Sequence, residues 1–171
     1  MAIAGLNVME MLRDQLKLKQ LEIDSLLEIT KAINSNKSAS ALFELFHRTL
    51  KDQIGVENIL LYSNNGDDWE PVIGNKFISE LNPGLINSLL KYNKLTDLSA
   101  LNGELPEYLK QYDILIPVFH KEKPLAYLLM SNPRAASYEP LDDKVKFAQT
   151  VTNIISVAIE NKRLSKKEVE Q

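Results

Sequence analysis

Two long helical patterns, one near each end of the chain, enclose a pair of strongly apolar segments, and this arrangement restricts the folds open to the sequence. Apolar residues recur at helical spacing over residues 8–34 and again over residues 140–164. Between them, Ile114–His120 and Leu125–Ser131 are almost continuously apolar, and the charged segment Lys121–Pro124 separates them. Such runs predict strands that are covered on both faces. We therefore expect one globular unit between two helices that extend out of it.

Composition limits the classes of function. The 171 residues, 44% of them hydrophobic, fit one domain with helical extensions. The balance of 20 basic and 23 acidic residues gives a net charge of −3, so we expect no nucleic-acid partner. No apolar stretch is long enough to cross a bilayer, and the first seven residues do not resemble a secretion signal. The chain has no cysteine, which excludes disulfides and catalytic thiols and fits a cytoplasmic location.

The first helix carries a possible coiled-coil seam. Spacings of three and four connect eight positions, six of them apolar: Met9, Leu12, Leu16, Lys19, Ile23, Leu26, Thr30 and Ile33. At 1.5 Å per residue this helix would be about 40 Å long, more than a domain of this size needs to cover its core. The apolar residues outside the seam are expected to face the domain: Leu18, Leu21, Leu27 and Ile29. An ordinary long core helix is the alternative.

We expect the seam to form a parallel homodimer, together with the last helix. The predicted interface consists of Met9, Leu12, Leu16, Ile23, Leu26, Ile154 and Ala158. Lys19 and Thr30 would be polar interruptions, which a two-stranded coiled coil tolerates at a cost in stability.

The middle of the chain predicts short strands and helices. Ser38 is placed to cap a second helix that runs through Ile54 and ends at Gly55. The elements that follow are strands at Glu57–Ser63 and Trp69–Gly74, a helix at Asn82–Tyr92, a strand at Leu95–Leu98 and a helical turn within Pro106–Gln111. Pro117 predicts an edge or bulge position for its strand, because proline cannot donate a ladder hydrogen bond. This order predicts an α+β fold, with an antiparallel sheet and the terminal helices on one face.

These elements together resemble a GAF domain. The resemblance covers about Leu26–Leu164 and is carried by the segments LLEITKAIN, ILLYS, ILIPVFH with its internal proline, PLAYLLMSN and AIENKRL. It implies a six-stranded antiparallel sheet, with the N- and C-terminal helices packed on one face and a pocket on the other, closed by roughly Gly74–Asp113. The expected division of the chain is a seam helix over residues 1–34, a GAF-like domain over 35–164, and the start of a helical linker to an effector domain over 165–171.

GAF pockets hold cyclic nucleotides, bilins, haem, small metabolites or nothing. The lack of cysteine excludes a thioether-linked bilin and cysteine-dependent sulfoxide reduction. Residues 75–77 lack the spacing of the cyclic-nucleotide signature, and residues 74–113 contain no arginine that could bind a phosphate through two bonds. We therefore expect no covalent cofactor and a small, uncharged or weakly polar organic ligand. Aromatic residues would line the pocket: Trp69, Phe77, Tyr92, Tyr108, Tyr112 and Tyr127.

Other polar residues have structural explanations. His47 is expected to be partly buried on the second helix, and His120 to lie at a solvent-facing strand end. The acidic pairs at residues 67–68 and 142–143 fit a turn and a helix start, so we expect no metal site. The sequence contains no nucleophile elbow, phosphate-binding loop or zinc-protease motif, and no enzymatic activity is expected.

The leading hypothesis is a regulatory signal-input and dimerisation module of a larger signalling protein, with or without a small-molecule ligand. The resemblance points to a histidine kinase, a PPM-type serine phosphatase or a cyclic-di-GMP enzyme as the effector. The alternative is a purely structural dimerisation module, which large side chains filling the pocket between Phe77 and Tyr112 would favour.

Overall fold

The structure, a computed structural model, describes residues 2–66, 68–74, 77–78, 82, 84–101, 105–133 and 141–170. Its helices are α1 (Ala2–Asn34), α2 (Ala39–Arg48), α4 (Leu85–Leu89) and α5 (Leu141–Glu170), with a π-helical segment at Thr49–Ile54 and 3₁₀ turns at Leu98–Leu101 and Glu107–Leu109. The strands are β1 (Ile59–Asn64), β2 (Trp69–Ile73), β3 (Thr96–Asp97), β4 (Ile114–His120) and β5 (Lys123–Met130). This order confirms the α+β prediction.

The strands form one antiparallel sheet in the order β2-β1-β5-β4-β3. The central strand is β5, where Leu128 pairs with Leu61 of β1 on one side and with Ile116 of β4 on the other. The two apolar runs that were expected to be covered on both faces thus form β4 and β5, next to each other in the middle of the sheet. The resemblance implied six strands, and the described residues contain five.

Pro117 lies where the sheet does not require its missing N–H group. Strand β3 is only two residues long and pairs with Ile114 and Leu115 of β4. Pro117 therefore lies beyond the end of β3, and a bulge follows it between Val118 and Phe119. This part of β4 has no strand on its outer side and adjoins a bulge, in agreement with the edge or bulge position predicted for the proline.

The turn between β4 and β5 is tighter than expected. Lys121 and Glu122 adopt left-handed conformations, with φ values of 53° and 66°. Positive φ at both central residues is typical of a type I′ turn, which joins two strands through a two-residue loop. Pairing consequently extends to His120 and Lys123, so β5 begins two residues earlier than the sequence suggested.

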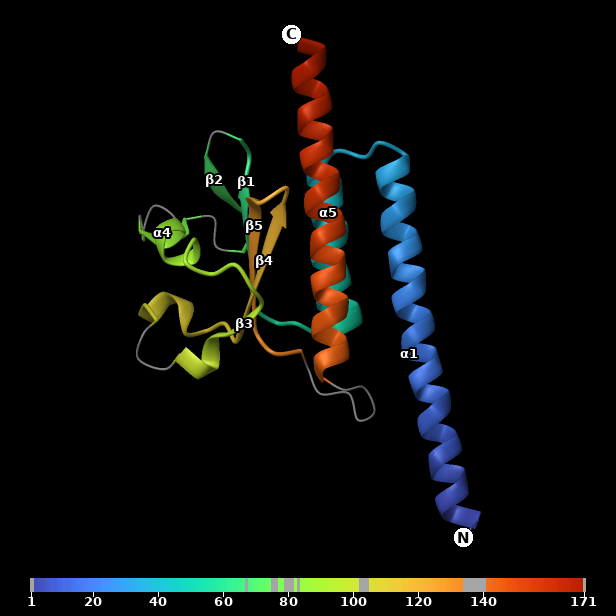
Figure 1. Ribbon diagram of the computed structural model, residues 1–171. Coiled ribbons are helices and arrows are strands. Elements are labelled where there is room, and N and C mark those ends of the chain that lie inside the picture. The colour runs from blue at the N-terminus through green and yellow to red at the C-terminus, as the bar shows by residue number, and fades with distance from the viewer. Residues whose placement is uncertain are drawn as a thin grey trace.

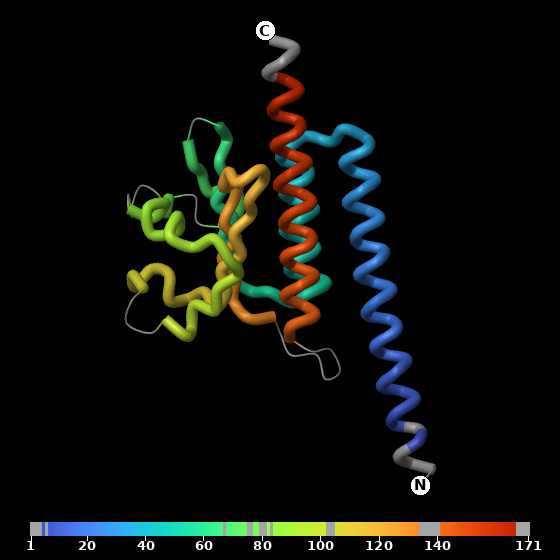
Figure 2. The backbone as a smooth tube through the Cα atoms, viewed as in Figure 1, coloured from blue at the N-terminus to red at the C-terminus, as the bar shows by residue number. Residues whose placement is uncertain are grey.

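The molecule is layered (Figure 1). Helices α5 and α2 cover one face of the sheet, α1 lies outside them, and α4 with the two 3₁₀ turns lies on the other face. The helix-side core is built by α1, α2, α5 and the sheet, with fully buried members such as Ile29, Phe46, Ile116, Leu128 and Val151. In both Figures 1 and 2, α1 and α5 run in the same direction, so the start of α1 and the end of α5 lie at opposite ends of the molecule.

Only the second half of α1 packs against the domain. Ser25 and Ile29 are buried there, whereas the first half projects past the sheet and the other helices (Figure 1). Leu21 and Leu27 were expected to face the domain, but they are exposed by 46% and 53%. The contact is a narrow strip of the helix surface around Ser25 and Ile29, and both leucines lie outside it.

The second helix begins and ends where the sequence predicted. The Ser38 side chain accepts a hydrogen bond from the N–H of Ala41, and Gly55 ends the helix with a φ of 79°. The last six residues, Thr49–Ile54, widen into a π-helical segment that the sequence did not reveal. The predicted helix over residues 82–92 is shorter, since α4 spans only Leu85–Leu89 and the proposed start at Pro83 lies outside the described residues.

Candidate functional site on the aromatic face of the sheet

The face of the sheet opposite α2 and α5 carries a second apolar cluster, called here the aromatic face. Its buried members are Leu60, Tyr62, Ile78, Leu85, Leu89, Leu98, Leu109, Tyr112, Leu115, Tyr127 and Leu129. Strands β1, β4 and β5 supply its floor, and α4 and the 3₁₀ turns supply leucines that cover the floor. Helix α4 and the two 3₁₀ turns thus pack onto the sheet where the resemblance implied a pocket.

Trp69 is in ring contact with two tyrosines of this face. Trp69 of β2 stacks on Tyr62 of β1, with ring centroids 5.8 Å apart and planes inclined by 22°. Trp69 also contacts Tyr127 of β5 at 5.5 Å and 35°. The sequence analysis did not select Tyr62. The alternation of side chains along β1 could have identified Tyr62, because it places Leu60 and Tyr62 on the aromatic face and Leu61 in the helix-side core.

The structure brings together five of the six predicted pocket residues. Tyr112 and Tyr127 are buried members of the cluster, and Trp69, Tyr92 and Tyr108 are partly buried against it. Phe77 is 64% exposed and does not belong to the cluster.

Tyr127 has a buried hydroxyl group without a hydrogen-bond partner in the described part of the chain. Its side chain is fully buried, and this burial raises the pKa of Tyr127, so the hydroxyl stays protonated and can donate. Burial raises the pKa of Tyr112 as well. Leaving a buried polar group unpaired costs about 1–3 kcal/mol, which an acceptor on a bound molecule would recover.

The residues predicted for dimerisation divide between exposed and buried surfaces. Met9, Leu12, Leu16 and Ile23 are exposed by 62%, 54%, 71% and 51%. Leu26 and Ile154 pack against the helix-side core, and Ala158 is partly buried. Leu27 was not among the residues of the predicted seam, but it is exposed on the same side of α1 as these four residues.

Within the described part of the chain, neither histidine belongs to a group of side chains that could hold a metal ion. His47 is exposed on α2, contrary to the expected partial burial, because the neighbouring Phe46 occupies the buried side of the helix. His120 lies half-buried at the end of β4. The described residues contain no group of three or more His, Cys, Asp or Glu side chains that could hold a metal ion.

None of the helices described here has both the length and the apolar character needed to cross a membrane.

Solved structures share this architecture. A GAF domain of a putative sensor histidine kinase from Pseudomonas syringae pv. tomato is 13% identical, with a TM-score of 0.60 over 92% of this chain and 97% of that one. A GAF domain/HD domain protein from Geobacter sulfurreducens is 12% identical, with a TM-score of 0.53 over 77% and 98%. The GAF domain of an Acinetobacter phosphoenolpyruvate-protein phosphotransferase is 18% identical, with a TM-score of 0.50 over 81% and 92%.

Neither a protein-family model nor a curated protein matches the sequence. The likeness therefore concerns architecture, and it confirms the resemblance that the sequence motifs indicated. The chain has the fold of a GAF domain.

Proposed function

We propose that the chain is a non-catalytic signal-input and dimerisation module of a larger cytoplasmic signalling protein. The GAF fold supports this, since similar structures include domains of a sensor histidine kinase and of a phosphotransferase. A histidine kinase, a PPM-type serine phosphatase or a cyclic-di-GMP enzyme would be the effector. The observation that carries the proposal is a stripe of exposed apolar side chains on α1.

This stripe, called the α1 seam, consists of Met9, Leu12, Leu16, Ile23 and Leu27. At 100° per residue these side chains occupy the side of the helix opposite Ser25 and Ile29, so the domain itself does not cover them. Burying one such side chain contributes about 1.5–3 kcal/mol. A second copy is the occupant that fits, because a two-fold axis places the same stripe against itself.

The parallel direction of α1 and α5 would allow a dimer to transmit a signal to an effector domain. Because α1 and α5 run in the same direction (Figure 2), a parallel dimer about α1 would also bring the two copies of α5 out of the domain at the same end. A change in the packing of the two domains would then move the two α5 ends relative to each other. An effector attached there would sense that movement.

Sedimentation velocity at micromolar concentration tests the dimer. The wild-type chain is expected to sediment as a dimer, and Leu16→Glu combined with Ile23→Glu is expected to give a folded monomer. Lys17→Glu is the matched control, because Lys17 is exposed on α1 and lies off the seam, and its reversal adds the same two negative charges. A wild-type monomer, or a dimer that survives the double substitution, contradicts the proposal.

We further propose that the aromatic face binds a small, uncharged or weakly polar organic molecule without a covalent bond. The unpaired hydroxyl of Tyr127 and the rings of Trp69 and Tyr62 support this proposal, because ligand sites commonly combine apolar walls with a few polar groups. The ligand would enter by displacing the leucines of α4 and the 3₁₀ turns. That displacement would be the input signal.

Thermal shifts with a library of uncharged metabolites test the ligand. A ligand at 100 times its dissociation constant should stabilise the fold by about 2.7 kcal/mol. Trp69 is the single tryptophan of the chain, so the same ligand should change its fluorescence, and Tyr127→Phe should weaken the response.

The second candidate is a structural dimerisation module without a ligand. The close packing of Leu85, Leu89, Leu98 and Leu109 over the sheet favours it, because these side chains occupy the place of the implied pocket. If the chain is a dimer and no metabolite shifts its melting temperature, this second function replaces the first.

A further inference from the structure

A separate cleft opens on the helix side of the sheet, at the end where α5 leaves the domain. It lies between the start of α2, the β1–β2 hairpin and the second half of α5, and its volume is about 420 Å³. Its apolar lining comes from Ala39, Phe43, Val72, Leu125 and Ile159. This volume falls within the range of about 300–1,000 Å³ that is usual for small-molecule sites. The proposed functions do not involve this cleft.

The rim of the cleft is basic. Lys162, Arg163 and Lys166 line it together with Glu70 and Glu160. Arg163 forms two hydrogen bonds with Glu160, from Nη2 to Oε1 at 2.7 Å and from Nε to Oε2 at 3.0 Å. The hydrogen bond from Arg163 is the main cause that lowers the pKa of Glu160, so this carboxylate stays charged and paired. Among the described residues that line the cleft, this leaves Lys162 and Lys166 against one carboxylate, that of Glu70. Nζ of Lys162 also donates a hydrogen bond to Oδ1 of Asn36 at 2.5 Å.

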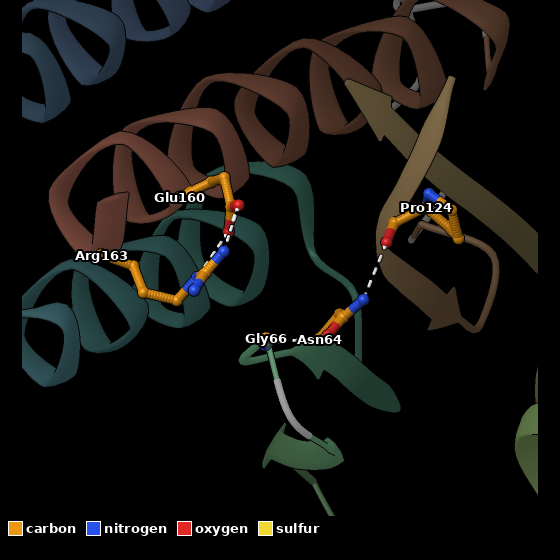
Figure 3. Close-up of polar contacts among 5 residues, drawn as sticks. All are labelled: Asn64, Gly66, Pro124, Glu160 and Arg163. Carbon is orange, nitrogen blue, oxygen red and sulfur yellow. Dashed lines mark hydrogen bonds and ion pairs between the residues drawn. The ribbon is translucent and has the colours of Figure 1, made fainter. Parts of the chain in front are cut away.

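Arg163 also closes one side of the cleft. Figure 3 shows its side chain pointing from α5 towards the turn at Gly66, beside Asn64. The two are so close that a Cβ atom at Gly66 would lie 2.6 Å from Nη1 of Arg163. The turn itself is held by Asn64, whose Oδ1 accepts from the N–H of Gly66 and whose Nδ2 donates to the carbonyl of Pro124. The wall formed by α5 and the hairpin is thus a packed contact.

The amino terminus of α2 lies at the cleft. Ser38 Oγ accepts from the N–H of Ala41, whereas the N–H groups of Ala39 and Ser40 meet no acceptor in the described residues. Free N–H groups and the positive end of the helix dipole favour an anion at this place.

A second observation points to a ligand independently of the helix. Ser156 of α5 lines the same cleft and is only 8% exposed, yet its Oγ has no hydrogen-bond partner among the described residues. A buried hydroxyl without a partner is unfavourable unless another molecule supplies one. The cleft thus combines the free N–H group of Ala39, an unpaired hydroxyl and two lysines around an apolar lining.

We propose that this cleft binds a small organic anion with an apolar body. The carboxylate or phosphate group contacts the N–H group of Ala39 and the ammonium groups of Lys162 and Lys166. The apolar body lies against Phe43, Val72 and Ile159. Because Ser156, Ile159 and Lys162 belong to α5, such a ligand contacts the helix that leads out of the domain.

The test is a titration of the ¹⁵N-labelled full chain with hexanoate, hexyl phosphate, inorganic phosphate and hexanol. Hexanoate or hexyl phosphate should shift the amide signals of Ala39, Ser40 and Ser156. Hexanol and inorganic phosphate should bind roughly tenfold more weakly, because each lacks one half of the interaction. The stronger of the two anions identifies the head group.

Two variants locate the anion. Ala39→Pro removes one free N–H at the first helical position, where proline is favoured, and Ser38, with a ψ of 158°, has the conformation that a residue before proline requires. It should weaken binding roughly tenfold at an unchanged melting temperature. Lys166→Glu should weaken binding roughly threefold to tenfold, whereas Lys146→Glu, at an exposed position near the other end of α5, should leave it unchanged.

Some outcomes would overturn the proposal. Absence of shifts at millimolar hexanoate and hexyl phosphate is one, and equal affinities of wild type, Lys166→Glu and Lys146→Glu are another. Shifts confined to Trp69, Leu115 and Tyr127 would place the ligand on the aromatic face, which rejects this site and supports the proposed ligand function. If Ala39→Pro lowers the melting temperature, its weaker binding could come from lost structure. The affinities of Lys166→Glu and Lys146→Glu then decide whether the anion binds in this cleft.

Discussion

Trp69 lies against Tyr127, with ring centroids 5.5 Å apart and planes inclined by 35°. The contact joins the edge strand β2 to the central strand β5 across β1. Trp69 is partly buried, whereas the Tyr127 side chain is fully buried and its hydroxyl is unpaired in the described residues. The fluorescence of Trp69 is therefore sensitive to any rearrangement around that hydroxyl.

Tyr127→Phe should stabilise the ligand-free protein. The substitution removes a buried hydroxyl that has no partner in the described residues and keeps the ring, so the free energy of unfolding should rise by about 1 kcal/mol. Urea denaturation followed by Trp69 fluorescence measures this change, and Tyr108→Phe, at a partly buried position, is the control with little expected change. A loss of stability in Tyr127→Phe would show that the hydroxyl is hydrogen-bonded in solution.

The stability of the chain should fall in acid partly through Glu160. The hydrogen bond from Arg163 lowers the pKa of Glu160 below its ordinary value of 4.5. A carboxyl whose folded-state pKa is depressed stabilises the fold above its unfolded-state pKa and loses this contribution as the pH falls through the folded-state value. At pH 7, Glu160→Gln should therefore lower the free energy of unfolding, by about 1–2 kcal/mol.

The pH profile distinguishes this charge effect from simple packing. The difference between wild type and Glu160→Gln should be constant above about pH 5 and should shrink as the pH falls below 4.5. Urea midpoints at pH 7, 5, 4 and 3 measure it. A difference that does not depend on pH would mean that Glu160 acts through its shape alone.

Much of the architecture follows from local sequence signals. The apolar runs of β4 and β5 predict strands that are covered on both faces, and the Ser38 and Gly55 caps predict the ends of the second helical unit. These predictions succeed because strand periodicity and helix capping depend on neighbouring residues. The π-helical turn at Thr49–Ile54 has no such signal in its neighbouring residues, and its Leu50 and Ile54 pack in the helix-side core.

The site residues were harder to predict, for a related reason. Aromatic character was enough to place Tyr112 and Tyr127 in the cluster, but it could not show that Phe77 would be exposed. That outcome depends on how the segment after β2 returns to the sheet. The cleft beside Arg163 was missed altogether, because it combines residues from α2, β1, β2 and α5 that are far apart in the sequence.

Substitutions in the β4–β5 turn should stabilise the protein. Lys121 and Glu122 both have positive φ, a conformation that asparagine and glycine adopt at a lower cost. Lys121→Asn combined with Glu122→Gly should therefore raise the free energy of unfolding by about 1 kcal/mol. Thermal or urea unfolding measures the gain, with Lys123→Asn, in the adjacent strand position, as a control that should not stabilise.

Gly74 should not accept a side chain. Its φ is 99°, and a Cβ atom there would lie 2.5 Å from the carbonyl oxygen of Ile59, a backbone atom that cannot move away. Gly74→Ala should destabilise the fold by at least about 2 kcal/mol, through strain and the loss of space at the β1–β2 pair. Gly84→Ala is the matched control, because no atom of the described residues lies within 4 Å of a Cβ at that position. Equal melting temperatures for the two variants would contradict the close approach.

The hydrophobic pair that Ile116 and Leu128 form across β4 and β5 should be among the largest single contributions to stability. The two residues face each other in the strand register, and both are fully buried in the helix-side core. Truncation to alanine leaves a cavity in addition to the lost burial, so each variant should lose about 2–5 kcal/mol. Phe119→Ala, on the same hairpin but 38% exposed, should lose clearly less despite its larger side chain. Urea unfolding of the three variants measures the order, and a loss below about 1 kcal/mol at both Ile116 and Leu128 would place them on a solvent-facing surface.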